Sequence, residues 1–162
     1  MGLKVVFINA TQHELTQEQK DAIKPFVERL VGDGGDVEVT ITNLKDELPE
    51  LYNQLSNIPY GTNTQPLIES LINKVVEIGD RYNASLTLIH FPIGSPRFMF
   101  EVAMVYAYLF RDGSIGDVYP IFSHTERKVV EEKLDDGSMK KVSVFKFNGY
   151  EIPLIENWIA RN

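Results

Sequence analysis

Short apolar runs alternate with amphipathic segments along the first three quarters of the chain. The apolar runs are bounded by small polar residues, which is the pattern of buried strands. Apolar positions three and four residues apart indicate helices between them. Strands are expected at Lys4–Asn9, Val37–Ile41, Ser85–His90 and Val118–Phe122. Helices are expected after Thr16, from Leu67 to about Arg81 and from Pro96 to Phe110, with short helical turns within residues 44–59.

Local signals mark where these helices begin and end. Thr16 and Gln19 fit a capping box, and Gly32 suits a helix end. Pro25 complicates the first helix, because an interior proline costs about 3 kcal/mol or kinks the helix. Pro49 divides the helical turns in residues 44–59. The alternation of strand and helix therefore predicts a parallel sheet with right-handed crossovers and helices on both faces.

The last third has a different pattern. Residues 126–134 and 139–147 flank a turn with the Asp-Gly hairpin signal, at Asp136-Gly137. An apolar tail, residues 148–162, is expected to pack back onto the domain. At 162 residues the chain fits one domain, 1–162. The predicted fold is thus α/β, a Rossmann-like open, mainly parallel sheet with an appended C-terminal β-hairpin at 126–147.

Composition narrows the functional classes. Cysteine is absent, which excludes disulfides, thiolate metal sites and thiol nucleophiles and fits a cytoplasmic protein. The start does not have the pattern of a signal peptide. The apolar stretch 98–110 contains Glu101 and is shorter than the roughly 20 residues of a spanning helix, so no membrane partner is expected. A net charge of −7 disfavours long nucleic acid and leaves room for a small basic pocket.

Open α/β sheets bind ligands beyond the carboxyl ends of their strands. Three segments of this sequence should meet at that edge: Asn9–His13, Phe91–Arg97 and Ser123–Lys128. Small, polar and basic side chains gather in all three. We expect the ligand site there.

Phe91–Arg97 carries the strongest candidates. Ser95 can cap the following helix, Pro96 can occupy its first turn, and Gly94 allows backbone to approach a ligand. Free N–H groups at the helix start would then face an anion, which would also favour Arg97 in the first turn. In the alternative interpretation, Ser95 only caps the helix and Arg97 only pairs with Glu101.

The other two segments supply further candidates. Asn9, Thr11, Gln12 and His13 follow the first strand and could bind a ligand or, alternatively, only lead into the helix cap. The second group comprises Ser123, His124, Arg127 and Lys128. These side chains could bind a ligand or could equally be ordinary solvent-exposed residues. His90 is interpreted as a core histidine with its hydrogen bonds satisfied. The aromatic and methionine residues of 98–110 are expected to serve the core first and a dimer surface second.

Several chemical motifs are absent. No P-loop motif occurs, and the glycines at 32–35 follow a helix, so they are no dinucleotide fingerprint. The histidines lack metal-ligand spacing, and no acidic cluster suggests a two-metal site. We therefore expect neither a metal nor another cofactor.

Both ends of the chain carry motifs of a known group. Residues 9–19, NATQHELTQEQ after the first strand, resemble the start of small type III CRISPR-associated proteins. Residues 120–133 and 142–147, including RKVVEEK and VSVFKF, resemble the hairpin of these proteins. The matches cover about a third of the chain. The resemblance implies a CARF-like, Rossmann-like homodimer that binds cyclic oligoadenylate across its two-fold axis, and some such proteins are ring nucleases that cut this messenger.

The resemblance also implies roles for the candidates. Ser95 and Arg97 would contact phosphate, supported by Arg127 and Lys128, while Thr11 and Gln12 would orient ribose or base. Asn9, Gly94 and Ser123 are further expected ligand-binding residues. His13 or His124 would act as acid or base in a metal-independent attack by the ribose 2′-hydroxyl. Asn148 follows Phe147 where the group often has a histidine, which removes one potential group.

That departure is consistent with a non-catalytic binder or sponge. An oligomerisation or adaptor module and a nucleoside- or sugar-phosphate enzyme also remain open.

Overall fold

A computed structural model of the chain describes residues 2–32, 35–115 and 117–153. The part of the expected tail beyond residue 153 lies outside the described residues. Within them, none of the helices is long and apolar enough to cross a membrane.

The centre of the molecule is a five-stranded mixed sheet with the order β2-β1-β3-β4-β5. The first four strands in this order are parallel to their neighbours, and β5 is antiparallel to β4. This confirms an α/β fold with a mainly parallel sheet. The strands are β1 (Leu3–Asn9), β2 (Val37–Asn43), β3 (Leu86–Phe91), β4 (Val118–Lys133) and β5 (Met139–Glu151).

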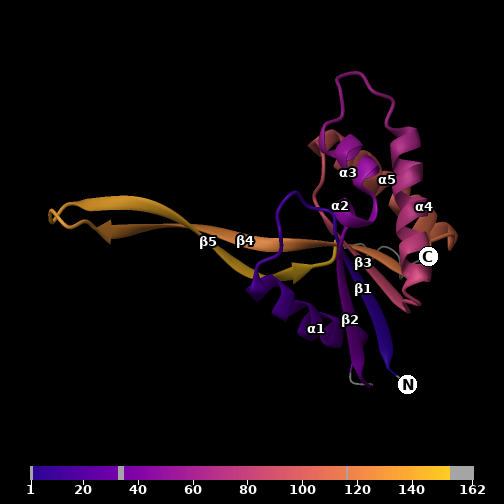
Figure 1. Ribbon diagram of the computed structural model, residues 1–162, viewed down its shortest axis with the longest axis horizontal. Coiled ribbons are helices and arrows are strands. Elements are labelled where there is room, and N and C mark those ends of the chain that lie inside the picture. Colours follow the sequence, from indigo (N-terminus) through magenta and orange to yellow (C-terminus); the bar gives the residue numbers. More distant parts are fainter. Residues whose placement is uncertain (1, 33–34, 116, 154–162) are drawn as a thin grey trace.

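Helices cover both faces of the sheet, as the alternating pattern predicts (Figure 1). Helix α1 (Gln17–Val31) packs on the face that presents Val5, Phe7 and Leu88. The other face presents Val6, Ile8 and Ile89 to the remaining helices. These are α2 (Leu44–Glu47), α3 (Pro49–Ser56), α4 (Gln65–Arg81) and α5 (Pro96–Asp112).

The helix ends agree with the sequence signals. Thr16 and Gln19 form the capping box of α1, with Gln19 N donating to Thr16 Oγ1 at 3.2 Å and Thr16 N donating to Gln19 Oε1 at 2.9 Å. The helix continues through Pro25, because burial of Ile23 and Val27 against the sheet offsets the cost of the proline. Pro49 separates α2 from α3 as expected.

The structure differs from the expectation at β4. The sequence predicts a strand at 118–122 and a separate hairpin strand at 126–134, with residues 123–125 between them. Instead, β4 is one strand from Val118 to Lys133, because no glycine or proline interrupts residues 121–133. β5 pairs with β4 up to the turn at Asp136-Gly137, and together they form a two-stranded ribbon that projects from the domain (Figure 1).

Gly79 allows α4 to approach β3 closely. An added Cβ at Gly79 would lie 2.4 Å from Thr87 Oγ1. Alanine normally stabilises a helix interior by about 1 kcal/mol relative to glycine, but overpacking a core costs about 1–3 kcal/mol. We therefore predict that Gly79→Ala lowers the free energy of unfolding by about 1–2 kcal/mol, measured by urea denaturation. In a Thr87→Ala background the same change should be neutral or stabilising, and an equal loss in both backgrounds would contradict this account.

Candidate functional site at the carboxyl edge of the sheet

The strand order reverses between β1 and β3. From β1 the chain passes through α1 on one face, and from β3 it passes through α5 on the other face. The two loops therefore diverge and leave a crevice at the carboxyl ends of these strands, which is where open α/β sheets bind ligands.

A cavity of about 340 Å³ occupies this crevice. This volume is near the lower end of the range for small-molecule sites. The loop after β1, the first turns of α1, the loop after β3 and the inner part of β4 all contribute to its wall. The lining residues are Thr11, Gln12, His13, Leu15, Gln19, His90, Phe91, Pro92, Ile93, Gly94, Ser123 and Thr125.

Three polar side chains from three adjacent strands are linked at the base of this cavity. Asn9 ends β1 and is the register partner of His90 in β3, and both are almost fully buried, with 2% and 3% of their surface exposed. His90 Nδ1 lies 3.1 Å from Asn9 Oδ1, and His90 Nε2 lies 2.6 Å from Ser123 Oγ. Ser123 is half-buried and lines the cavity. Its hydroxyl is therefore the point at which the hydrogen-bonded chain of Asn9, His90 and Ser123 can contact a ligand.

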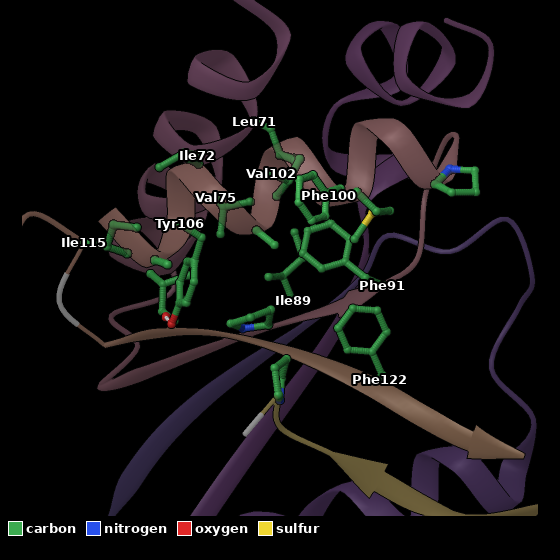
Figure 2. Close-up of a pocket in the computed structure, with 17 residues that line it drawn as sticks. Leu71, Ile72, Val75, Ile89, Phe91, Phe100, Val102, Tyr106, Ile115 and Phe122 are labelled. Carbon is green, nitrogen blue, oxygen red and sulfur yellow. Dashed lines mark hydrogen bonds between the residues drawn. The ribbon is translucent and has the colours of Figure 1, made fainter. Parts of the chain in front are cut away.

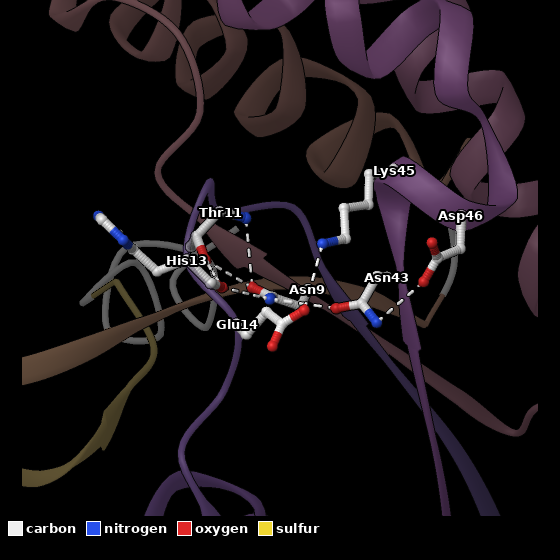
Figure 3. A network of polar contacts seen from close by, with 7 residues as sticks. All are labelled: Asn9, Thr11, His13, Glu14, Asn43, Lys45 and Asp46. Carbon is white, nitrogen blue, oxygen red and sulfur yellow. Dashed lines mark hydrogen bonds and ion pairs between the residues drawn. The ribbon is translucent and has the colours of Figure 1, made fainter.

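Asn9 also organises the loop after β1 (Figure 3). Its Oδ1 accepts hydrogen bonds from Thr11 N at 3.2 Å and Thr11 Oγ1 at 2.7 Å, and its Nδ2 donates to the carbonyl oxygen of His13 at 2.9 Å. On the opposite side, Asn9 Nδ2 donates to Asn43 Oδ1, whose own Nδ2 donates to Asp46. One buried amide therefore fixes both the loop that lines the cavity and the neighbouring strand end.

The surroundings of His90 keep its imidazole neutral. The rings of Phe7 and Tyr150 pack against it, each with a centroid distance of 5.5 Å. Burial lowers the pKa of His90 from its ordinary value near 6.5 to about 4, because the charged imidazolium loses its hydration. At neutral pH one ring nitrogen of His90 is therefore a hydrogen-bond acceptor.

The turn after β3 is exposed, and its candidate residues differ in whether they line the cavity. Gly94 lines the cavity, at φ +74° and so close to Leu55 that a Cβ would lie 2.7 Å from the Leu55 carbonyl oxygen. Ser95 caps α5 by accepting a hydrogen bond from Phe98 N, and Arg97 Nε lies 3.1 Å from Glu101 Oε1. Ser95 and Arg97 do not line the cavity. Their contacts are those of the alternative interpretation, in which Ser95 caps the helix and Arg97 pairs with Glu101. A role of either residue toward phosphate stays a prediction.

The remaining candidates separate into two groups. Thr11, Gln12, His13 and Ser123 line the cavity together, as the strand order requires, with the imidazole of His13 directed away from the Asn9 network (Figure 3). His124, Arg127 and Lys128 do not line it and lie in β4, which runs without a break through residues 123–125, between the two predicted strands. His124 Nδ1 lies 3.1 Å from Asn148 Nδ2, and Arg127 donates to Ser143 Oγ.

Alternation along β4 nevertheless keeps Arg127 near the site. Ser123, Thr125 and Arg127 are spaced by two residues, so they project from the same face of the strand, whereas Lys128 projects from the opposite face. Arg127 is thus the next side chain outward from the cavity wall.

The sequence analysis did not assign His90, Asn43 or Asp46 to the site. The interpretation of His90 as buried and hydrogen-bonded is confirmed, but His90 also lines the cavity. Period-two alternation could have found it, because Phe7 and Asn9 share one face of β1, and Leu88 and His90 share that face of β3. No local signal in the sequence pairs Asn43 with Asn9, which requires the register of β1 and β2.

A second cavity of about 490 Å³ lies between α4, α5 and the sheet (Figure 2). Its labelled lining residues are apolar side chains that include Val75, Phe91, Phe100 and Tyr106. The Tyr106 hydroxyl donates to the carbonyl oxygen of Val118 at 2.6 Å, so it is already paired. This cavity has no convergent polar groups for recognising a polar ligand, and the cavity at the carboxyl edge is the better candidate site.

Over residues 2–32, 35–115 and 117–153, no group of three His, Cys, Asp or Glu side chains is placed to hold a metal ion.

The low pKa of His90 predicts a specific loss of stability in acid. Below pH 6.5 the unfolded chain protonates His90 and the native protein does not, so the free energy of unfolding falls with pH until about pH 4. The contribution of His90 amounts to about 2 kcal/mol between pH 8 and pH 5. Urea denaturation across this range should show a shallower pH dependence for His90→Gln than for the wild type, and identical slopes would contradict the assignment.

Comparison with known proteins places the chain in a family. No curated protein and no solved structure matches it. Residues 5–151 match the family described as the uncharacterized protein MJ1673 family. The matched range begins in β1 and ends with the last residue of β5, so it contains the sheet except for the first two residues of β1, and all residues that line the carboxyl-edge cavity. The chain belongs to this MJ1673 family.

Proposed function

We propose that this protein binds a cyclic oligoadenylate at the carboxyl edge of its sheet and cleaves it without a metal ion, as a cytoplasmic ring nuclease with a CARF-like, Rossmann-like domain. The observation that supports the proposal is the polar cavity at the switch point of the sheet, lined by groups from β1, β3 and β4. The terminal motifs shared with type III CRISPR-associated proteins supply the class of ligand.

The cavity offers donors for phosphate and hydroxyls for sugar. In the described part of the chain, the backbone N–H groups of Gln12, His13 and Gly94 donate no hydrogen bond within the protein. They are therefore available to phosphodiester oxygens, as at other anion sites built from loop backbone. The hydroxyls of Thr11, Ser123 and Thr125 lie on the same wall and suit ribose.

The exposed basic side chains of Arg97 and Arg127 lie within three residues of the cavity lining in the sequence but do not line the cavity themselves. Arg97 follows Gly94 by three residues and is exposed, and Arg127 extends the β4 face that carries Ser123. Their guanidinium groups would attract the ligand and hold the outer phosphates, since such groups bind phosphate in a bidentate manner.

The proposed reaction is a transesterification within the ring. The ribose 2′-oxygen attacks the adjacent phosphorus, the bond from phosphorus to the 5′-oxygen breaks, and a 2′,3′-cyclic phosphate and a free 5′-hydroxyl result. The 2′-hydroxyl loses its proton and the 5′-oxygen gains one. His13 is the exposed imidazole among the lining residues that could supply the second proton. Holding the 2′-oxygen in line with phosphorus supplies much of the rate.

The size of the cavity favours a homodimer. A volume of about 340 Å³ suits one nucleotide unit rather than a whole ring, so a symmetric ring requires a second copy of the cavity. A stripe on α5 supports self-association, because Phe100, Met104 and Tyr108 are 67%, 60% and 70% exposed and recur every four residues. The opposite side of α5, including Phe98 and Val102, is buried in the core.

The same stripe supports the second candidate function, an oligomerisation or adaptor module in which the α5 surface binds the partner.

A third candidate is a binder that sequesters the messenger, which is supported by Asn148 and the exposed position of His124. Sequestration would show stoichiometric, reversible uptake of the ring with no linear product.

The leading proposal predicts binding and cleavage in the presence of EDTA. Incubation with cyclic tetra-adenylate should give linear products that end in a 2′,3′-cyclic phosphate, detected by mass spectrometry. Arg97→Ala should weaken binding about tenfold, the usual effect of losing one charge-assisted hydrogen bond. Arg29→Ala is the matched control, because Arg29 lies in the last turn of α1, at the other end of the helix from the turns that contribute to the cavity wall. An intact ring together with no measurable binding would overturn the proposal.

The α5 stripe predicts the oligomeric state. Phe100→Glu or Tyr108→Glu adds a charge to an exposed position, so folding should be preserved and self-association lost. Light scattering after size-exclusion chromatography should show a dimer for the wild type and a monomer for both variants. A wild-type monomer at high protein concentration, or dimers in all three cases, would rule out this surface as the dimer contact.

A further inference from the structure

The polar groups at the base of the cavity form one row across four strands. Asn43, Asn9 and His90 are register partners at the ends of β2, β1 and β3. Ser123 is two residues beyond Ile121, the register partner of His90 in β4, so Ser123 lies on the same face as Ile121. Asp46, in the first turn of α2, adjoins Asn43 at the outer end of the row (Figure 3).

Neighbouring groups that can only donate or only accept set the direction of the hydrogen bonds in the row. A carboxylate accepts only, so the Nδ2 of Asn43 faces Asp46 and its Oδ1 faces Asn9. Asn9 Nδ2 then donates to Asn43 and to the carbonyl oxygen of His13, which leaves Asn9 Oδ1 toward the backbone N–H of Thr11.

This orientation fixes the tautomer of His90. Asn9 Oδ1 can only accept, so the hydrogen bond at His90 Nδ1 requires a proton on that nitrogen. A neutral imidazole then has a bare Nε2, and Ser123 Oγ must donate its proton to it across 2.6 Å. Burial keeps the pKa of His90 low, so the ring stays neutral at physiological pH.

Ser123 therefore acts only as a hydrogen-bond acceptor toward the cavity. Its hydroxyl proton is committed to His90, so its free lone pairs can only accept a hydrogen bond from a ligand. His90 itself is 3% exposed and has both ring nitrogens occupied, so a ligand reaches it only through Ser123. The neighbouring loops present backbone N–H donors, so a matching ligand carries an anionic group beside a hydroxyl donor.

We propose that Ser123 accepts the attacking ribose 2′-hydroxyl and relays its proton to His90, with Asn9, Asn43 and Asp46 as positioning residues that hold the row in this direction. The relay rests on the proposed function. The 2′-hydroxyl proton passes to Ser123 Oγ as the Ser123 proton passes to His90 Nε2, and the bond from O2′ to phosphorus forms while the bond to O5′ breaks. The imidazolium of His90 then returns its proton through Ser123 to solvent, and His13 or water protonates the leaving O5′.

The relay makes a prediction that needs no ligand. Long-range ¹H–¹⁵N correlation spectra of the imidazoles, with His90 assigned by comparison with His90→Gln, should show a proton on Nδ1 and a bare Nε2. Asp46→Asn should leave this tautomer unchanged, because the backbone N–H of Thr11 and the carbonyl oxygen of His13 also hold the orientation of Asn9. A proton on Nε2 in the wild type would overturn the relay, because Ser123 would then be an acceptor for His90 and a donor to the ligand. This outcome leaves the proposed function unaffected.

Kinetics separate the relay from a merely structural role. Ser123→Ala and His90→Gln should each reduce the single-turnover cleavage rate of cyclic tetra-adenylate about 100-fold, within the range of proton-transfer catalysis, and change the dissociation constant less than tenfold. Ser114→Ala, at a serine outside the cavity lining, is the matched control and should cleave at the wild-type rate.

A 2′-O-methyl ring tests the donor directly. The wild type should bind this analogue more weakly than the natural ring, and Ser123→Ala should discriminate between the two less. Unchanged cleavage by Ser123→Ala, or undiminished discrimination, would overturn the relay while leaving ring cleavage intact. Absence of binding by the wild type would instead reject the proposed function, and the relay with it.

Discussion

The hydrogen bond between Asn9 and His90 constrains the rest of the molecule. Two polar side chains at the ends of adjacent central strands are almost completely removed from water, and each would cost about 1–3 kcal/mol without a partner. Their pairing requires the observed register of β1 and β3. A shift of β3 by one residue relative to β1 would place His90 on the opposite face, in the apolar core beneath α4 and α5, and leave Asn9 without this partner. The polar pair therefore fixes strand register as firmly as the apolar core does, and it also fixes where the cavity opens.

The loop after β1 depends on the same pair. Thr11 and His13 are both held by Asn9 as well as by the contact of Thr11 Oγ1 with the His13 carbonyl oxygen, so a buried side chain helps to set the wall of the cavity. A site built in this way is preorganised, because binding requires little ordering of the loop. Among the described residues, the hydrogen-bond partners of His90 are Asn9 and Ser123, which carry no charge, so an imidazolium there is poorly stabilised.

Much of the fold could be predicted from the sequence. Periodicity located the parallel strands and the helices, and the Thr16–Gln19 box and Pro49 located helix ends, because these signals are local. The extent of β4 could not be predicted in the same way, since Ser123–Lys128 is polar enough for a loop and becomes strand only by pairing with β5. The site was found only in part. Thr11, Gln12, His13, Gly94 and Ser123 meet as the strand order requires, but the pairing of Asn9 with Asn43 and His90 depends on register. Arg97 illustrates the limit of composition, because the sequence does not show that it lies outside the cavity lining and beside Glu101.

The ribbon and the cavity share one uninterrupted backbone. From Ser123 to Lys133, β4 extends about 33 Å at the usual rise of a strand. Its base is the strand segment that holds the Ser123 hydroxyl against His90. The pairing of β4 with β5 along the ribbon therefore continues without interruption into the strand that forms one wall of the cavity.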